Sequence, residues 1–167
     1  MEVISCLSEM QKSSLQWERE GKKIGFVPTM GSLHQGHLSL IDLVRDQSDL
    51  VILSIFVNPT QFAEGEDLEK YPRELERDLQ LCKEHEVDFV FTPRMEDIYK
   101  ENASTYIVEK SVSEKLCGQF RPSHFKGVTT ICAKLFNLCR PTFVALGQKD
   151  AQQVSVLKRM IEDLHFP

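Results

Sequence analysis

The chain has 167 residues, which is enough for one domain and short for two. Apolar residues make up 41% of it and charged residues 27%, a mixture typical of globular proteins and not of disordered ones. The 20 basic and 25 acidic side chains give a net charge of −5, which disfavours nucleic acid as a partner.

Apolar runs alternate with helical patterns along the chain, and this order is typical of a parallel α/β sheet. The clearest strand is nearly all apolar (LVILSIFV), as expected of a strand that is covered on both faces. In chain order we expect a helix at Leu7–Glu20, a strand at Ile24–Val27, a helix from Gly36 onward, a strand at Leu50–Val57, a helix at about Arg73–His85, strands at Asp88–Thr92 and, more weakly, Tyr106–Glu109, helices at Val112–Leu116 and Gly127–Leu138, a strand at Phe143–Leu146 and a helix at Asp150–Leu164.

Four or five strands, each followed by a helix, predict a doubly wound, Rossmann-like parallel sheet. Such sheets bind their ligands outside the carboxyl ends of the strands. Residues that directly follow a strand are therefore the place to look for chemistry.

The cysteines are five in number, and no two of them have C-x-x-C spacing. The segment Met1–Met10 lacks the basic start and apolar stretch of a secretory signal, and no apolar run approaches the ~20 residues of a membrane span. These features predict reduced thiols in a cytoplasmic protein without a membrane partner. Cys132 and Cys139 lie in an apolar helical pattern, which favours core packing over metal binding.

The densest group of reactive side chains lies in the segment PTMGSLHQGH, from Pro28 to His37. A strand ends here and a helix begins, and a helix N-terminus presents unpaired N–H groups that attract an anion. Gly31 and Gly36 permit a tight turn and the close approach of a ligand.

Two well-known phosphate-binding patterns do not match this turn. The G-x-G-x-x-G dinucleotide pattern is absent because Leu33 stands where a glycine is required. The glycine spacing of a Walker A loop is present, but His37 and Leu38 replace the lysine and the hydroxyl residue. What remains is the pattern His-x-Gly-His, which places His34 and His37 three residues apart over a helix start.

Both imidazoles can then donate hydrogen bonds to phosphate oxygens and stabilise the charge on a leaving pyrophosphate. Two alternatives stay open from the residues alone. One histidine can cap the helix while the other is merely exposed. Zinc is a weaker alternative, because no third ligand lies nearby and the H-E-x-x-H pattern is not matched.

The segment PTMGSLHQGHLSLI closely resembles the signature of the pantoate–β-alanine ligase family, within the HxGH nucleotidylyltransferase superfamily. Four further segments resemble that family in the same order, and together they cover most of the chain: Ser54–Phe62, Glu66–Arg73, Arg121–Val128 and Ala145–Gln153. The resemblance implies ATP with Mg²⁺, pantoate and β-alanine as small-molecule ligands, and a homodimer.

The resemblance also implies the roles of individual residues. Those implied in ATP binding are Met30, Gly31, Ser32, Leu33, His34, Gln35, Gly36, His37, Gly147, Gln148, Lys149 and Asp150. Those implied in substrate binding are Gln61 for pantoate and β-alanine, Gln153 for pantoate, Asn58 and Arg121. As catalytic residues, His37 would stabilise or protonate pyrophosphate, His34 would bind the ATP phosphates, and Lys149 would neutralise charge in the transition state.

Several of these residues also have a structural alternative. Asp150 suits the cap of its own helix, and the loop around Arg121 can be merely solvated, with His124 as a structural residue. The chain departs from the family at Gln148, where an acid is usual, and at Ala151, where an aromatic residue is usual.

The implied reaction has two steps. The pantoate carboxylate attacks the α-phosphorus of ATP to give pantoyl adenylate and pyrophosphate, and the amine of β-alanine then displaces AMP to give pantothenate. Positioning and charge stabilisation would be the main work of the protein. Mg²⁺ commonly takes phosphate oxygens plus one or two carboxylates. Asp78 is a candidate from its family position and equally an ordinary surface acid, so no residue is assigned to a metal.

Members of the family carry a second, C-terminal domain that closes over the nucleotide, and this chain stops at Pro167, before any such domain. We therefore expect residues 1–167 to be the N-terminal nucleotide-binding domain, with very weak turnover by itself. Two other functions stay open: a plain nucleotidylyltransferase, which keeps the nucleotide on its product, and a non-catalytic nucleotide-binding or dimerisation module.

Overall fold

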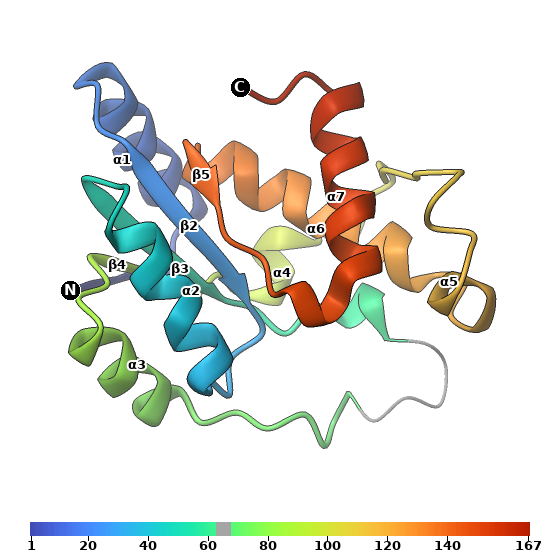
Figure 1. The fold of residues 1–167 in the computed structure, drawn as a ribbon, viewed down its shortest axis with the longest axis horizontal. Coiled ribbons are helices and arrows are strands. Elements are labelled where there is room, and N and C mark those ends of the chain that lie inside the picture. The colour runs from blue at the N-terminus through green and yellow to red at the C-terminus, as the bar shows by residue number, and fades with distance from the viewer. Residues whose placement is uncertain (63–67) are drawn as a thin grey trace.

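The computed structural model describes residues 1–62 and 68–167, and it contains a five-stranded, all-parallel sheet in the order β1-β4-β3-β2-β5 (Figure 1). Its strands are β1 (Glu2–Ile4), β2 (Ile24–Thr29), β3 (Leu50–Ile55), β4 (Phe89–Phe91) and β5 (Phe143–Val144). The prediction of a Rossmann-like parallel sheet is thereby confirmed. Glu66 and Asp67, which open the family-like segment Glu66–Arg73, lie outside the described residues.

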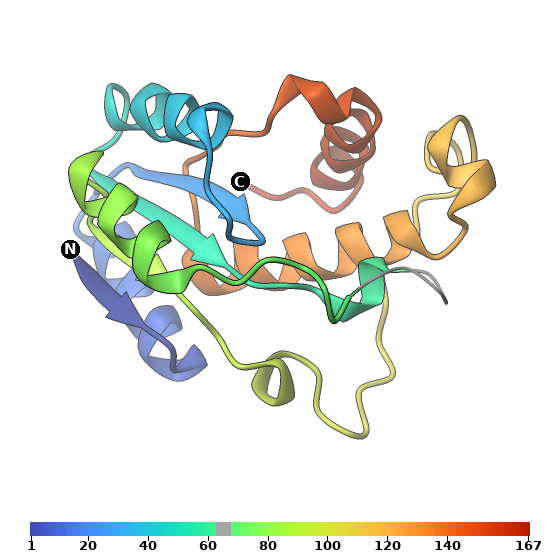
Figure 2. The ribbon, with the colours of Figure 1, turned by 90° about the horizontal axis from the view of Figure 1, so that it is seen from below.

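Helices cover both faces of this sheet, and Figure 2 shows α2 and α6 on opposite sides of it. The longer helices are α1 (Leu7–Arg19), α2 (Gln35–Arg45), α3 (Leu75–Glu84), α6 (His124–Cys139) and α7 (Ala151–Asp163). The short ones are α4 (Met95–Ile98), α5 (Cys117–Phe120) and the 3-10 turns η1 (Pro59–Gln61) and η2 (Gln148–Asp150). Among the described residues, none of these helices combines the length and hydrophobicity that crossing a bilayer needs.

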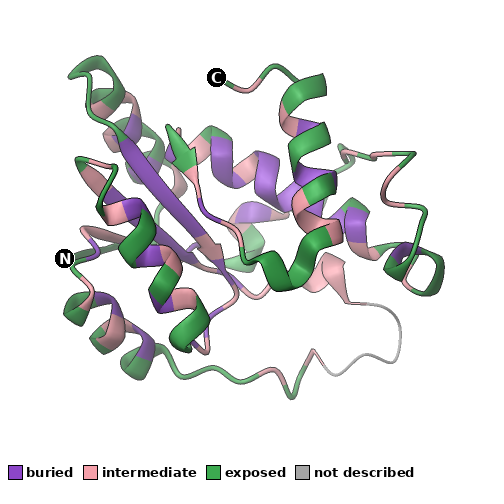
Figure 3. Ribbon diagram, viewed as in Figure 1, coloured by how far each residue is buried: buried purple, intermediate pink, exposed green. Residues whose placement is uncertain are grey.

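Side-chain alternation along the central strands produces two apolar cores, one on each face. Phe26 and Ile52 pack with α1, α6 and α7, whereas Val27 and Leu53 pack with α2 and α3, and all four are fully buried. Phe26 meets Phe136 of α6 edge-on, with ring centroids 6.2 Å apart. Figure 3 shows the buried residues concentrated on β2, β3 and α6. The sheet is therefore a fixed frame from which the turns at its carboxyl edge project.

Strand β1 was not predicted. It pairs in parallel with β4, with Glu2 opposite Phe89 and Ile4 opposite Phe91. Only Ile4 of its three residues is buried, so the segment carries no periodic pattern that would reveal a strand. Its place is decided by the partner strand, which is far away in sequence.

The prediction of a strand at Tyr106–Glu109 is wrong. The main chain of Ile107 bonds to helix side chains instead: Thr129 Oγ1 donates to its carbonyl oxygen at 2.7 Å, and its N–H donates to Thr130 Oγ1 at 3.0 Å. Two hydroxyls on α6 thus satisfy the polar groups that a neighbouring strand would otherwise satisfy.

Several element boundaries also differ from the prediction. Strand β2 does not end at Val27 but continues through Pro28 to Thr29, with Pro28 opposite Ser54 of β3. The helix expected at Val112–Leu116 is instead the later α5, and α6 begins before the predicted Gly127.

Candidate active site

Two turns at the carboxyl edge of the sheet hold most of the predicted site residues. One joins β2 to α2, and the other joins β5 to α7 through η2. Because β2 and β5 are neighbours in the sheet, the two turns lie side by side (Figure 1). Lys149 and Asp150 in the second turn act electrostatically on His37 in the first, which places the predicted catalytic residues together.

His34 and His37 cap the start of α2 reciprocally. His34 is the N-cap residue, and its Nδ1 accepts the main-chain N–H of Gly36 at 3.1 Å. The Nδ1 of His37 accepts the N–H of His34 at 3.3 Å, and the ring centroids are 4.1 Å apart. The alternative of one capping and one merely exposed histidine is therefore wrong, because both rings act as caps, and this arrangement leaves the two Nε2 atoms for a ligand.

This capping fixes Nδ1 of both rings as a hydrogen-bond acceptor. A main-chain N–H can only donate, so each Nδ1 must be an unprotonated acceptor and each neutral ring must carry its proton on Nε2. The pKa of His37 is lowered, first because burial disfavours the imidazolium and then because His34 lies beside it. Asp78 and Asp150 act in the opposite direction. Each ring therefore directs an Nε2–H donor away from the helix, and burial favours the neutral form of His37.

The expectation that this turn offers unpaired main-chain N–H groups is wrong for most of its residues. These groups are already bonded within the protein: Gly31 to Thr29 Oγ1, Ser32 and Leu33 to Asp78, His34 to His37, and Gly36 to His34. An anion at this helix start would therefore be bound mainly by imidazole N–H donors. A typical phosphate-binding loop uses its main-chain N–H groups instead.

Asp78 is not a surface acid, which was one of its two expected roles. It is 1% exposed, and each carboxylate oxygen accepts a main-chain N–H at 2.7 Å. Within residues 1–62 and 68–167, no group of three or more His, Cys, Asp or Glu side chains is arranged to hold a metal ion.

The turn after β5 has the opposite character, because Gly147, Gln148, Lys149 and Asp150 are all exposed. A Cβ placed on Gly147 would meet nothing within 4 Å, and its φ of −66° suits any residue. Lys149 makes no ion pair with a described residue. Asp150 makes no side-chain cap bond to α7, so the helix-capping alternative is wrong. Space and charge at this turn are open to a ligand.

Gln61 lies at the end of η1, where one side chain from the connection between α5 and α6 and one from the first residue of α6 hold its main chain. His124 Nδ1 bonds to its carbonyl oxygen at 3.0 Å, and Arg121 Nη2 donates to the same oxygen at 3.3 Å. Arg121, which the family resemblance implied as a substrate ligand, therefore has a positioning contact in this structure. The Gln61 side-chain amide has no hydrogen-bond partner among the described residues.

Asn58 is buried and holds the start of η1. Its Nδ2 donates to the Gly127 carbonyl at 3.2 Å, and its Oδ1 accepts from Tyr99 at 2.9 Å and from Thr60 at 3.0 Å. A Cβ on Gly127 would lie 2.4 Å from the Thr60 carbonyl oxygen, so only glycine lets α6 approach this turn so closely. These contacts favour a positioning role for Asn58 over direct substrate binding.

A family model described as pantoate-beta-alanine ligase matches residues 2–167, nearly the whole chain. The chain belongs to the pantoate-beta-alanine ligase family. It is 51% identical over 167 residues to the pantothenate synthetase of Sulfurihydrogenibium sp. (strain YO3AOP1), covering 100% of this chain and 60% of that protein. It is 52% identical over 166 residues to that of Thermosipho melanesiensis, covering 99% and 59%.

Solved structures of the family have the same fold. The pantothenate synthetase of Thermus thermophilus superposes with a TM-score of 0.94 at 43% identity, covering 100% of this chain and 59% of that one. The Francisella tularensis ligase, solved in complex with beta-gamma ATP and beta-alanine, has a TM-score of 0.94 at 38% identity, covering 99% and 64%. This chain thus spans about three-fifths of the length of these family members.

Two residues that contact the site were not assigned to it from the sequence. His124 was expected to be structural, and its bond to Gln61 now gives it a defined task. Asp78 could have been found by a local signal, because it lies four residues before the buried Cys82 of α3. An acid on the apolar face of an amphipathic helix needs a partner inside the protein.

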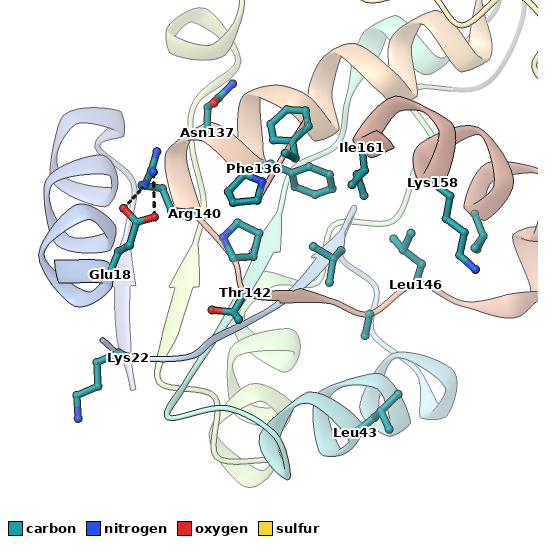
Figure 4. A pocket seen from close by; sticks show the side chains of 16 residues that line it. Glu18, Lys22, Leu43, Phe136, Asn137, Arg140, Thr142, Leu146, Lys158 and Ile161 are labelled. Carbon is teal, nitrogen blue, oxygen red and sulfur yellow. Dashed lines mark hydrogen bonds and ion pairs between the residues drawn. The ribbon is translucent and has the colours of Figure 1, made fainter. Parts of the chain in front are cut away.

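A cavity of about 610 Å³ lies beside β5 and between α6 and α7, and Ala145 and Leu146 from the start of the second turn are among its lining residues (Figure 4). Its lining is mainly apolar. On its rim Arg140 and Glu18 form a bidentate ion pair, in which Nε donates to Oε2 at 2.7 Å and Nη2 donates to Oε1 at 2.9 Å. None of the predicted site residues lines it. The cavity thus borders the second turn, since Leu146 directly precedes Gly147, but the predicted site residues themselves do not line it.

Proposed function

We propose that this chain binds ATP and pantoate for an ATP-dependent ligase that joins pantoate to β-alanine through pantoyl adenylate. The observation that carries the proposal is the pair of imidazoles whose Nδ1 atoms accept main-chain N–H groups, which leaves both Nε2–H groups as donors near the exposed Lys149. Family membership supports the reaction class, and the Francisella relative, whose structure contains beta-gamma ATP and beta-alanine, supports the ligands.

In the first step, the pantoate carboxylate attacks the α-phosphorus of ATP and pyrophosphate leaves. Negative charge develops on the leaving oxygens, and two Nε2–H donors from His34 and His37 stabilise it without reorganising. Proton transfer from a neutral imidazole would leave an imidazolate, so we assign His37 to hydrogen-bond donation rather than to protonation of pyrophosphate. Lys149 adds a mobile cation from the neighbouring turn.

In the second step, the amine of β-alanine attacks the acyl carbon of the adenylate and AMP leaves. Gln61 carries a side-chain amide that can donate and accept, which suits a hydroxy acid and an amino acid bound side by side. Its main chain is held by His124 and Arg121, so the amide is presented from a fixed point. Gln153, in the first turn of α7, is the proposed second pantoate contact.

Mg²⁺ belongs to the proposal as the partner of ATP, and when bound it neutralises phosphate charge. Asp78 does not suit it, because both of its oxygens are occupied by N–H groups. Asp150 does suit it, since its exposed carboxylate makes no cap bond and lies within electrostatic reach of His37. We assign this acid to the metal–phosphate complex.

Two further parts of the proposal rest on the family resemblance: residues 1–167 act as the N-terminal nucleotide-binding domain, and the protein is a homodimer. A third part, that the protein works in the cytoplasm, rests on the cysteine pattern. The five cysteines are free thiols, which agrees with a reducing compartment. Sedimentation equilibrium of the chain tests the dimer directly.

The reaction is tested by incubating the chain with ATP–Mg²⁺ and pantoate, with and without β-alanine, and measuring AMP. A ligase releases AMP only when β-alanine is present, whereas a nucleotidylyltransferase keeps the nucleotide on its product. Calorimetric titration with ATP–Mg²⁺ accompanies the assay. Binding without any product would support the non-catalytic module, and no binding by the wild-type chain would contradict the proposal.

A further inference from the structure

We propose that Asp78 is a positioning residue, whose buried carboxylate holds the turn after β2 in the conformation that sets His34 and His37 over the start of α2. The structural part of this inference stands on contacts within the chain. Its consequence for nucleotide binding rests on the proposed function.

Asp78 is a buried carboxylate whose hydrogen-bond partners among the described residues all come from the turn after β2. Its neighbours Glu76 and Arg77 on α3 are exposed, whereas Asp78 is 1% exposed. No ion pair with a described cation compensates its charge. Instead Oδ2 accepts the N–H of Ser32 and Oδ1 that of Leu33, both at 2.7 Å, as charge-assisted hydrogen bonds. A buried carboxylate is satisfied here by the turn alone.

The backbone of this turn has a conformation that needs support from its surroundings. Gly31 and Ser32 are consecutive left-handed residues, with φ of +84° and +53°. For serine this conformation costs about 1–2 kcal/mol, and it persists only where the surroundings fix it. A Cβ on Gly31 would lie 3.1 Å from Oδ2 of Asp78, which shows that the carboxylate lies directly against the turn. The bond from Ser32 to Asp78 is the contact that fixes it.

Leu33 connects this turn to the two histidines, because it directly precedes His34 and is held by α3. Arg77 Nη1 donates to the Leu33 carbonyl at 3.2 Å, so α3 holds both main-chain groups of the fully buried Leu33. His34 follows Leu33 directly, and its N–H is bonded to the His37 ring. The hydrogen bonds from α3 to Leu33 therefore position both imidazoles.

The negative charge of Asp78 allows a positioning role of this residue to be distinguished from a purely electrostatic one. The negative charge of Asp78 acts on the nearby His37, Tyr71 and Cys82. It would also repel a phosphate bound at the imidazoles. Removal of this charge should strengthen anion binding if Asp78 acts only electrostatically, and should weaken it if Asp78 holds the turn.

The test compares the wild-type chain with Asp78→Asn and Glu76→Gln. Asparagine has nearly the shape of aspartate, but its amide nitrogen is a donor, so the variant side chain can accept only one of the two N–H bonds. Glu76→Gln removes the same charge from an exposed position of the same helix. Amide hydrogen exchange is measured by NMR without nucleotide, and ATP–Mg²⁺ affinity by calorimetry.

In Asp78→Asn we expect the Ser32 and Leu33 amides to exchange about tenfold faster or more, with a smaller change at Val51 and Leu53 in β3. ATP affinity should fall about tenfold or more, while Glu76→Gln leaves exchange and affinity within about twofold. If Asp78→Asn does not fold, Asp78→Glu replaces it, with the same local acceleration expected.

Unchanged exchange at Ser32 and Leu33 would overturn the inference, as would tighter ATP binding by Asp78→Asn. Equal acceleration throughout β3 would also overturn it, because Asp78 would then serve global stability only. Failure of the wild-type chain to bind ATP would contradict the proposed function, and the exchange measurement would still decide whether Asp78 holds the turn.

Discussion

The two turns at the carboxyl edge of the sheet occupy equivalent places, after the neighbouring strands β2 and β5, yet they are built in opposite ways. In the first, most main-chain N–H groups between Gly31 and Gly36 are bonded within the protein, and a buried acid holds the turn. The second, Gly147–Asp150, is exposed, and its side chains are not used to cap α7. One turn presents preorganised donors, whereas the other offers open space and a movable cation.

Under the proposed function, this difference indicates that the two turns have different roles in binding and catalysis. Donors that are fixed before the ligand arrives stabilise developing charge without reorganisation, which is the most effective form of electrostatic catalysis. A flexible lysine can follow charge as it moves from one bond to another. If the two turns divide the work in this way, equivalent substitutions in them should have different consequences.

The largest effect is expected for His37→Ala, which removes both an Nε2–H donor and a cap on the His34 N–H. Adenylate formation should fall by about 10²–10³-fold, the usual loss for one preorganised donor. His37→Asn is the matched control, because its carbonyl oxygen can still accept the cap while the distal donor is lost. It should retain stability in urea denaturation and lose the rate. A normal rate in His37→Asn would show that only the cap matters.

Lys149→Gln should weaken ATP–Mg²⁺ binding about tenfold or more, through loss of a charge-assisted contact, with stability within about 0.5 kcal/mol. Affinity in the wild type should also decline more steeply with salt than in the variant. Lys158→Gln serves as the control, since Lys158 is an exposed lysine of α7 that lines the cavity. Equal losses in both variants would indicate a general charge effect.

Two glycine substitutions compare the turns directly. Gly31→Ala forces a Cβ onto a residue with φ of +84°, 3.1 Å from Asp78 and Ile55, and should lower the free energy of unfolding by about 1–2 kcal/mol. Gly147→Ala meets nothing within 4 Å and should change it by less than about 0.5 kcal/mol. Urea denaturation measures both. Equal losses would mean that the second turn is as constrained as the first.

The smallest effect is a pH dependence from His37. Its pKa is lowered by burial and by His34, so the folded state binds this proton less readily than the unfolded chain. Its contribution to stability is therefore present above pH ~6.5 and is lost as the pH falls below that value. NMR titration of the ring should give a midpoint below ~6.5, and thermal unfolding of His37→Asn should depend less on pH between about 7.5 and 5. A midpoint at or above ~6.5 would contradict a buried, capping imidazole.

The fold was largely predictable because its signals are local. Apolar runs such as Leu50–Val57 need burial on both faces, and their alternation with amphipathic helices leaves a doubly wound sheet as the consistent arrangement. The places of His34 and Lys149 followed in the same way, since parallel strands end at one edge. Strand β1 and the segment at Tyr106–Glu109 were missed or misassigned because their partners are distant in sequence.

The amino-acid sequence by itself determined the layered sheet, the positions of the two turns after β2 and β5, and membership of the family. Only the tertiary structure decided how those turns are held: that Asp78 lies under the first turn, that both histidines are used as caps, and that His124 and Arg121 hold the Gln61 carbonyl. The physical reason is range. Burial patterns repeat every few residues, whereas a buried carboxylate finds its N–H partners 45 and 46 residues away, where no local period points.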